Sequence, residues 1–271
     1  MAWGRSRRAA VEEDKSWGRS LWETLKTIFW ALLIAGLFRT LLFQPFFIPS
    51  GSMKDTLLIG DFLFVNKMSY GYSYASCPSI PLGAIGLDIG ADDFCGWAEG
   101  RGRLWGGEPQ RGDVVVFRHP VTGQDFIKRL IGMPGDRIQM RDGRLVINDE
   151  PVEVVPAGTF VDEDAPGGAP REAARCRDTL PGGVTHDILD LGTTPQDNTG
   201  VFTVPAGSYF MMGDNRDNSM DSRFAQSAGG VGFVPAENLI GRADRVIFSS
   251  AGASMLFFWT WRPDRFFYPI D

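Results

Sequence analysis

Three short polar blocks in this chain carry residue types suited to acyl-transfer chemistry. The first is Ser50-Gly51-Ser52, which follows a long apolar run. Glycine allows the backbone to approach a ligand closely, and a serine beside it could act as a nucleophile. The serine's own N–H and a neighbouring hydroxyl could then stabilise an oxyanion. A plain linker turn is the alternative, and composition alone favours it.

The second block is FIKRLIG at 126–132. In a strand, Phe126, Lys128 and Leu130 share one face, which is apolar except for the lysine. Such surroundings lower an ammonium pKa from about 10.4 towards the 7–8 that a general base needs. The commoner alternative is a lysine whose head extends to water. Lysine is also scarce, because 22 of the 27 basic residues are arginines.

The third block is GDNRDNSMDSR at 213–223, which favours a rigid loop held by Asp–Arg pairs. A calcium loop and a solvated turn are the alternatives, although its arginines and the absence of a twelfth-position Glu disfavour calcium. The only histidines, His119 and His186, lie outside all three blocks. A general base here must therefore be another residue, and we expect both histidines to be replaceable without loss of catalysis.

Composition excludes several classes of protein. The chain has 271 residues, 44% of them hydrophobic, and a net charge of −6, which argues against a nucleic-acid partner. Two histidines make a multi-histidine zinc site improbable, so we expect neither a metal nor another cofactor. No serine is followed three positions later by lysine, which excludes the S-x-x-K pattern of penicillin-binding enzymes.

The apolar run at 27–48 predicts a transmembrane helix over 21–44, ended by Gln44-Pro45. Six basic residues lie before residue 27, and only one lies between residues 44 and 64. This asymmetry predicts a cytoplasmic N-terminus and an extracytoplasmic remainder. Residues 1–20 are expected to form a disordered cytoplasmic tail. A cleaved secretory signal and a buried core helix are the alternatives.

Beyond residue 44 the pattern predicts a mainly β fold. Short strands are expected at 61–65, 113–117, 126–131, 208–212 and 244–248, with a hairpin at 137–147 that turns at Asp142-Gly143. We expect one antiparallel domain over 45–250, with inserted β-rich or irregular segments at 70–112 and 151–199. The inserts contain Cys77, Cys95 and Cys176; the first two could form a disulfide or remain free. The aromatic segment 251–271 suits a membrane interface, or a strand at the core edge.

Together with RGDVVVF at 111–117, the three blocks resemble the successive motifs of bacterial type I signal peptidases, over roughly residues 20–250. The resemblance implies an all-antiparallel catalytic domain and a membrane-bound endopeptidase that cleaves signal peptides from exported preproteins. It implies a Ser/Lys dyad: Ser52 as nucleophile and Lys128 as general base.

The resemblance also implies supporting roles. Ser50 would complete the oxyanion hole with the Ser52 N–H, Ser219 would orient the lysine, and Asp221 and Arg223 would form a structural ion pair. The implied walls of the substrate pocket are Phe46, Ile48, Leu57 and Ile127.

The expected partners are preprotein signal peptides and the lipid bilayer, and the secretion machinery could be another. We expect a monomer in the bacterial plasma membrane. The chain departs from the family's best-known pattern in having one membrane helix rather than two. A membrane-anchored β domain that only binds a partner is the rival hypothesis, but it leaves the long polar blocks unexplained.

Overall fold

The computed structural model describes residues 3–77, 80–82, 87–89, 95–162, 170–252 and 257–270. The chain divides into two compact units, Met1–Leu41 and Leu42–Asp271.

The first unit is the helix α1 (Trp3–Leu41). Residues 3–20, for which disorder was expected, belong to this helix, and Ala, Arg and Glu in this stretch are strong helix formers. Residues 1 and 2 lie outside the described residues. Searched over the described residues, no helix has a segment both long enough and apolar enough for a membrane crossing.

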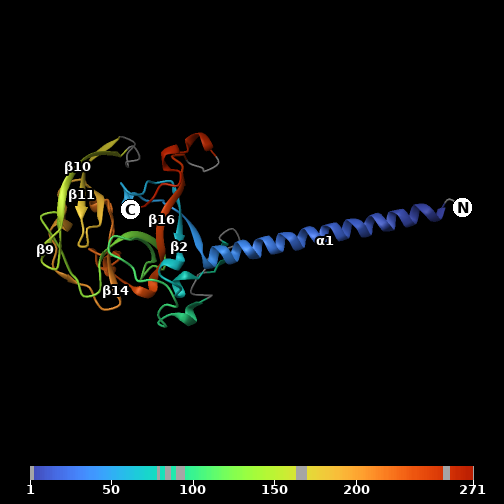
Figure 1. The fold of residues 1–271 in the computed structure, drawn as a ribbon, viewed down its shortest axis with the longest axis horizontal. Coiled ribbons are helices and arrows are strands. Elements are labelled where there is room, and N and C mark those ends of the chain that lie inside the picture. Colours follow the sequence, from blue (N-terminus) through green and yellow to red (C-terminus); the bar gives the residue numbers. More distant parts are fainter. Residues whose placement is uncertain are drawn as a thin grey trace. The chain divides into compact units, whose positions relative to one another are not determined.

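A seven-stranded antiparallel sheet organises the second unit (Figure 1). It contains all five separately predicted strands, although its longest strand is more extended than expected. Its first strand, at 43–47, was missed because it continues the apolar run of α1, and such runs do not distinguish strand from helix. The strands in spatial order are β1 (Phe43–Phe47), β2 (Asp61–Asn66), β16 (Leu239–Ser249), β5 (Val114–Arg118), β6 (Asp125–Gly132), β14 (Ser208–Met212) and β15 (Phe233–Pro235).

Three smaller sheets accompany it among the described residues, and the two larger of these correspond to predicted segments. The predicted hairpin at 137–147 is confirmed as β7 (Arg137–Arg141) and β8 (Arg144–Ile147), joined in one sheet by β9 (Glu150–Pro151) and β13 (Phe202–Thr203). The expected insert at 151–199 is mostly a three-stranded sheet of β10 (Glu153–Asp162), β11 (Arg171–Thr179) and β12 (Thr185–Asp190). We call β10–β12 the inserted sheet; residues 163–169 lie outside the described residues.

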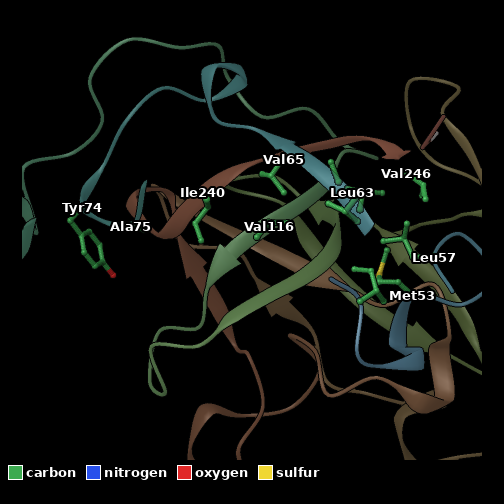
Figure 2. Packing of buried hydrophobic residues seen from close by; sticks show 12 residues of the cluster. Met53, Leu57, Leu63, Val65, Tyr74, Ala75, Val116, Ile240 and Val246 are labelled. Atoms are coloured by element: carbon green, nitrogen blue, oxygen red, sulfur yellow. The ribbon is translucent and has the colours of Figure 1, made fainter. Parts of the chain in front are cut away.

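The hydrophobic core reaches the loop that carries the first polar block. Met53 and Leu57, just after Ser52, are fully buried against Leu63, Val65 and other residues of the large sheet (Figure 2). Fully burying such a side chain contributes roughly 1.5–3 kcal/mol. The Ser-Gly-Ser block is therefore not a free linker, because the residues that follow it are part of the core.

The 70–112 segment is stabilised by a disulfide within it and by side-chain hydrogen bonds to the backbone. A disulfide joins Cys77 to Cys95, which answers the pairing question that the sequence left open. The Arg103 guanidinium donates to four backbone carbonyls, two of them in residues 70–71 and two in 236–239. This segment contains β3 (Ile80–Leu82) and β4 (Leu87–Ile89), and most of the residues between the two cysteines lie outside the described residues.

The C-terminal segment packs against the large sheet. Arg265 is buried, and its guanidinium lies 2.5 Å from an Asp61 carboxylate oxygen at the start of β2. Phe258 and Trp259 remain exposed, while Met255 and Leu256 lie outside the described residues. Within the described residues, the 3-10 turns are η1 (Gly51–Met53), η2 (Lys67–Ser69), η3 (Tyr74–Ser76), η5 (Gly96–Ala98), η6 (Pro195–Asp197), η7 (Arg216–Asn218), η8 (Gln226–Ala228), η9 (Ala236–Asn238), η10 (Phe258–Thr260) and η11 (Pro263–Arg265).

Candidate active site

The first two polar blocks meet at a serine and a lysine. Ser52 lies in η1, and Lys128 lies in the middle of β6. The Lys128 Nζ is 2.6 Å from the Ser52 Oγ, although 76 residues separate them in the chain. Both are buried, with 7% of Ser52 and 3% of Lys128 exposed. A nucleophile and a base within hydrogen-bond reach are the geometry that nucleophilic catalysis requires.

The environment of Lys128 favours its neutral form. Burial lowers the pKa of Lys128 to about 8, and the carboxylates of Asp221 and Asp214 only partly oppose this effect. The Nζ also donates to the Ile127 carbonyl at 2.9 Å, which fixes the direction of the side chain. The Phe126 ring, 5.7 Å away, forms part of the apolar surroundings. Lys128 can therefore lose its proton near neutral pH, as a general base must.

The third polar block holds the turn that carries Ser52. The Asn215 N–H donates to the Ser52 carbonyl at 3.2 Å, and the Asn215 side-chain amide donates to the Gly51 carbonyl at 3.0 Å. Gly213 is packed so closely that a Cβ there would lie 2.5 Å from the Ser52 carbonyl oxygen. This loop therefore sets the position of the Ser52 backbone.

Two buried arginine–aspartate ion pairs stabilise the loop formed by the third polar block, residues 213–223. The predicted Asp221–Arg223 pair is present, with the guanidinium donating to both carboxylate oxygens at 2.9 Å. Asp221 also accepts from the Gly213 N–H. A second buried pair, Arg129 with Asp214, links the loop to β6 beside Lys128. Sequence reasoning missed this pair, although a charged residue in the buried half of a strand is a signal that it needs a partner.

Ser219, to which the resemblance gives the role of orienting the lysine, makes no hydrogen bond to Lys128. Its Oγ is buried and has no hydrogen-bond partner among the described residues, and Lys128 bonds to the Ile127 carbonyl instead. The Ser219 Oγ lies against Gly213, where an added Cβ would approach it to 2.3 Å. Ser219 is thus packed within the loop of the third polar block, and its action on the lysine stays a prediction.

A cavity of about 390 Å³ opens beside the dyad. Of the predicted wall residues, Phe46, Ile48 and Ile127 line it, and Ser50 lies on its exposed rim. Leu57 does not line it, because its side chain points into the core, where it is fully buried. The whole lining consists of residues 46–50, Ser52, residues 124–128, Asn218 and Met220. An extended apolar peptide segment could reach the Ser52 hydroxyl through this cavity.

Neither histidine competes with Lys128 for the role of base. The His119 Nδ1 accepts from the backbone N–H groups of Val121 and Thr122, a turn-forming role. His186 is buried 3.9 Å from an Asp214 oxygen, and burial together with the Arg129 charge lowers its pKa to about 3. Neither residue lines the cavity. Among the described residues, no cluster of His, Cys, Asp and Glu could hold a metal ion.

We expect peptide-bond cleavage to lose activity at low pH through Lys128. The reaction needs the neutral amine, so with a pKa of about 8 the active fraction is about one tenth at pH 7 and falls tenfold per further unit. The profile of kcat/KM should therefore rise with pH and level off above about 8. A profile that is flat from pH 6 to 9 would contradict this assignment.

Comparison with known proteins identifies the family. A family model described as signal peptidase, peptidase S26, matches residues 21–248. The signal peptidase I of Rickettsia typhi is 41% identical over 227 residues, which cover 81% of this chain and 77% of the relative. That of Rickettsia canadensis is 40% identical over 233 residues, covering 83% and 79%. The chain belongs to the peptidase S26 family of signal peptidases. The resemblance noted in its motifs, and the expected class of serine endopeptidase, are thus confirmed.

Proposed function

We propose that this chain is a membrane-bound endopeptidase that removes N-terminal signal peptides from exported preproteins through a Ser52/Lys128 dyad. The observation that carries the proposal is the 2.6 Å approach of the Lys128 Nζ to the Ser52 Oγ at a cavity with an apolar wall. Family membership supports the same activity.

The reaction follows from the positions of these two side chains. Neutral Lys128 accepts the Ser52 proton as the hydroxyl oxygen attacks the scissile carbonyl, and the backbone N–H of Ser52 and the hydroxyl of Ser50 stabilise the oxyanion. The lysine then donates its proton to the leaving amine. Water hydrolyses the resulting Ser52 ester, with Lys128 again acting as base. No step requires a metal or another cofactor.

The shape of the cavity supports selection of small side chains near the cleavage point. Phe46, Ile48 and Ile127 present apolar walls, and a larger substrate side chain would clash with them. Discrimination of this kind depends on steric exclusion rather than on hydrogen bonding.

The proposal also includes attachment to the bacterial plasma membrane by α1, with a cytoplasmic N-terminus. Apolar side chains along α1, among them Phe29, Leu32 and Ile34, are more than half exposed, as expected of a helix whose surroundings are lipid. The basic N-terminal end favours this orientation. We propose the lipid bilayer and signal peptides as partners of a monomer, with the secretion machinery as a further candidate and no role for nucleic acid. Protease treatment of intact cells expressing the chain should degrade residues beyond 44 and spare the N-terminus.

The direct test of function is cleavage of a purified preprotein by the full chain in detergent micelles. We expect one cut, after a small residue, with the released mature N-terminus identified by mass spectrometry. A preprotein whose residue before the cut is changed from alanine to tryptophan should remain intact. If the folded chain leaves the unchanged preprotein uncut, the rival hypothesis of a membrane-anchored binding domain replaces this one.

A further inference from the structure

We call residues 50–55, which carry Ser52, the nucleophile loop. The inserted sheet contacts this loop through Lys54, two residues after Ser52. The Lys54 side chain is 2% exposed, and its Nζ lies 2.5 Å from an Asp162 carboxylate oxygen at the end of β10. These residues are 108 positions apart in the chain. A buried ammonium loses its hydration, so it requires a partner of opposite charge to remain in place.

The next residue of the chain, Asp55, forms a second ion pair with the inserted sheet, with its charges reversed. Asp55 receives a hydrogen bond of 2.9 Å from the Arg175 guanidinium on β11. β10 and β11 are antiparallel neighbours in one sheet (Figure 1). Lys54 and Asp55 of the nucleophile loop thus pair with an aspartate on β10 and an arginine on β11, which are adjacent strands of the inserted sheet. This complementary pattern favours one register of the loop against the sheet.

The anchoring of Lys54 is transmitted to Ser52 over a short distance. The Cδ and Cε of Lys54 lie 3.3 Å from the position that a Cβ on Gly51 would occupy. The Lys54 N–H donates to the Gly51 carbonyl at 3.2 Å, so it closes the turn that presents Ser52. Neither Lys54 nor Asp162 lines the cavity beside the dyad. Neither residue therefore touches a substrate in this cavity, and the contacts above give them a route to Ser52 through the geometry of the turn.

We propose that Lys54 and Asp162 are positioning residues, and that the inserted sheet uses this pair to hold the Ser52 hydroxyl in reach of Lys128. The inference rests on the proposed peptidase function. Because nucleophilic attack is sensitive to displacements of about 1 Å, loosening the turn should slow the chemical step and leave substrate binding unchanged.

The test measures kcat and KM for preprotein cleavage by the full chain in detergent micelles. The variants are Lys54→Met, which keeps the apolar stem, Asp162→Asn, and the double variant. We expect each single variant to lower kcat about tenfold with KM within about twofold of wild type. The double variant should be no slower than either single variant, because both remove the same interaction.

A matched control is Arg177→Met. Arg177 lies on β11 of the same sheet and pairs with Asp187 on the adjacent strand, and half of its side chain is exposed. This change removes one positive charge, as Lys54→Met does, and we expect kcat to stay within about twofold of wild type.

Three results would overturn the proposal that Lys54 and Asp162 position Ser52 as a pair. These are an unchanged kcat in both single variants, a double variant whose loss is the product of the single losses, or a raised KM at constant kcat. If Lys54→Met fails to give a cooperative urea unfolding transition, Asp162→Asn decides the question, since its side chain lies at a strand end and is partly exposed. An inactive wild-type chain would instead refute the proposed function, so the two failures are distinguishable.

Discussion

Replacing Lys128 with arginine should lower kcat for preprotein cleavage by about a thousandfold or more, with the chain still folded. A positioned general base contributes about 10²–10⁴-fold, and a guanidinium stays protonated at every usable pH, so this contribution is lost. The ion pairs of the third polar block do not include Lys128, so the loop geometry should survive. The loss should also persist at pH 10, where the neutral amine of the wild type is at its maximum.

The measurement is a cleavage time course for wild type and Lys128→Arg, with urea unfolding as the check on folding. His186→Gln serves as the control, because it changes a buried titratable residue near Asp214 that takes no part in the proposed chemistry. Activity of Lys128→Arg within tenfold of wild type would refute the assignment of Lys128 as the base.

Ser52→Ala should lose still more activity, about 10⁴–10⁶-fold, because no other hydroxyl can take the place of the nucleophile 2.6 Å from the Lys128 amine. Ser50→Ala tests the neighbouring hydroxyl on the rim of the cavity. Removing one oxyanion donor typically costs about 10²–10³-fold in kcat, so Ser50→Ala should lie between wild type and Ser52→Ala.

Both serine variants are measured by single-turnover cleavage, and acylation is followed by the mass of the intact enzyme. An acyl-enzyme that forms in Ser52→Ala, or a Ser50→Ala variant as inactive as Ser52→Ala, would show that the nucleophile has been assigned to the wrong serine.

Local signals made Ser52 and Lys128 candidates, but by themselves they favoured a linker turn and a lysine that reaches water, so the resemblance of the long motifs decided the prediction of the dyad. The apolar surroundings of Lys128 follow from alternation along one strand, and Ser52 follows a recognisable apolar segment. The long sequence motifs then linked two residues that the chain keeps 76 positions apart. The strands of the large sheet were predictable from local signals, because runs of Val, Ile and Phe specify them directly.

The ion pairs around the dyad were less predictable, because a charged residue does not indicate its partner. Arg129 with Asp214, and Lys54 with Asp162, join segments 85 and 108 residues apart. The inserted sheet was expected only as a β-rich or irregular segment, without the positions of its strands. Much of β10 is exposed on both faces, so it lacks the apolar alternation by which a half-buried strand is identified. Leu57 was misplaced because an apolar side chain near a site fits a pocket wall and a core position equally well.

The scarcity of lysine has a practical consequence for chemical labelling. The unit spanning residues 42–271 has three lysines, Lys54, Lys67 and Lys128, and each is at most 3% exposed. Amine-reactive esters modify exposed amino groups, so in the folded chain they should attach to α1, where Lys26 is exposed, and leave the catalytic unit unmodified. Uptake of label by the catalytic unit would then report its opening, and surface immobilisation through amines would leave its active site free.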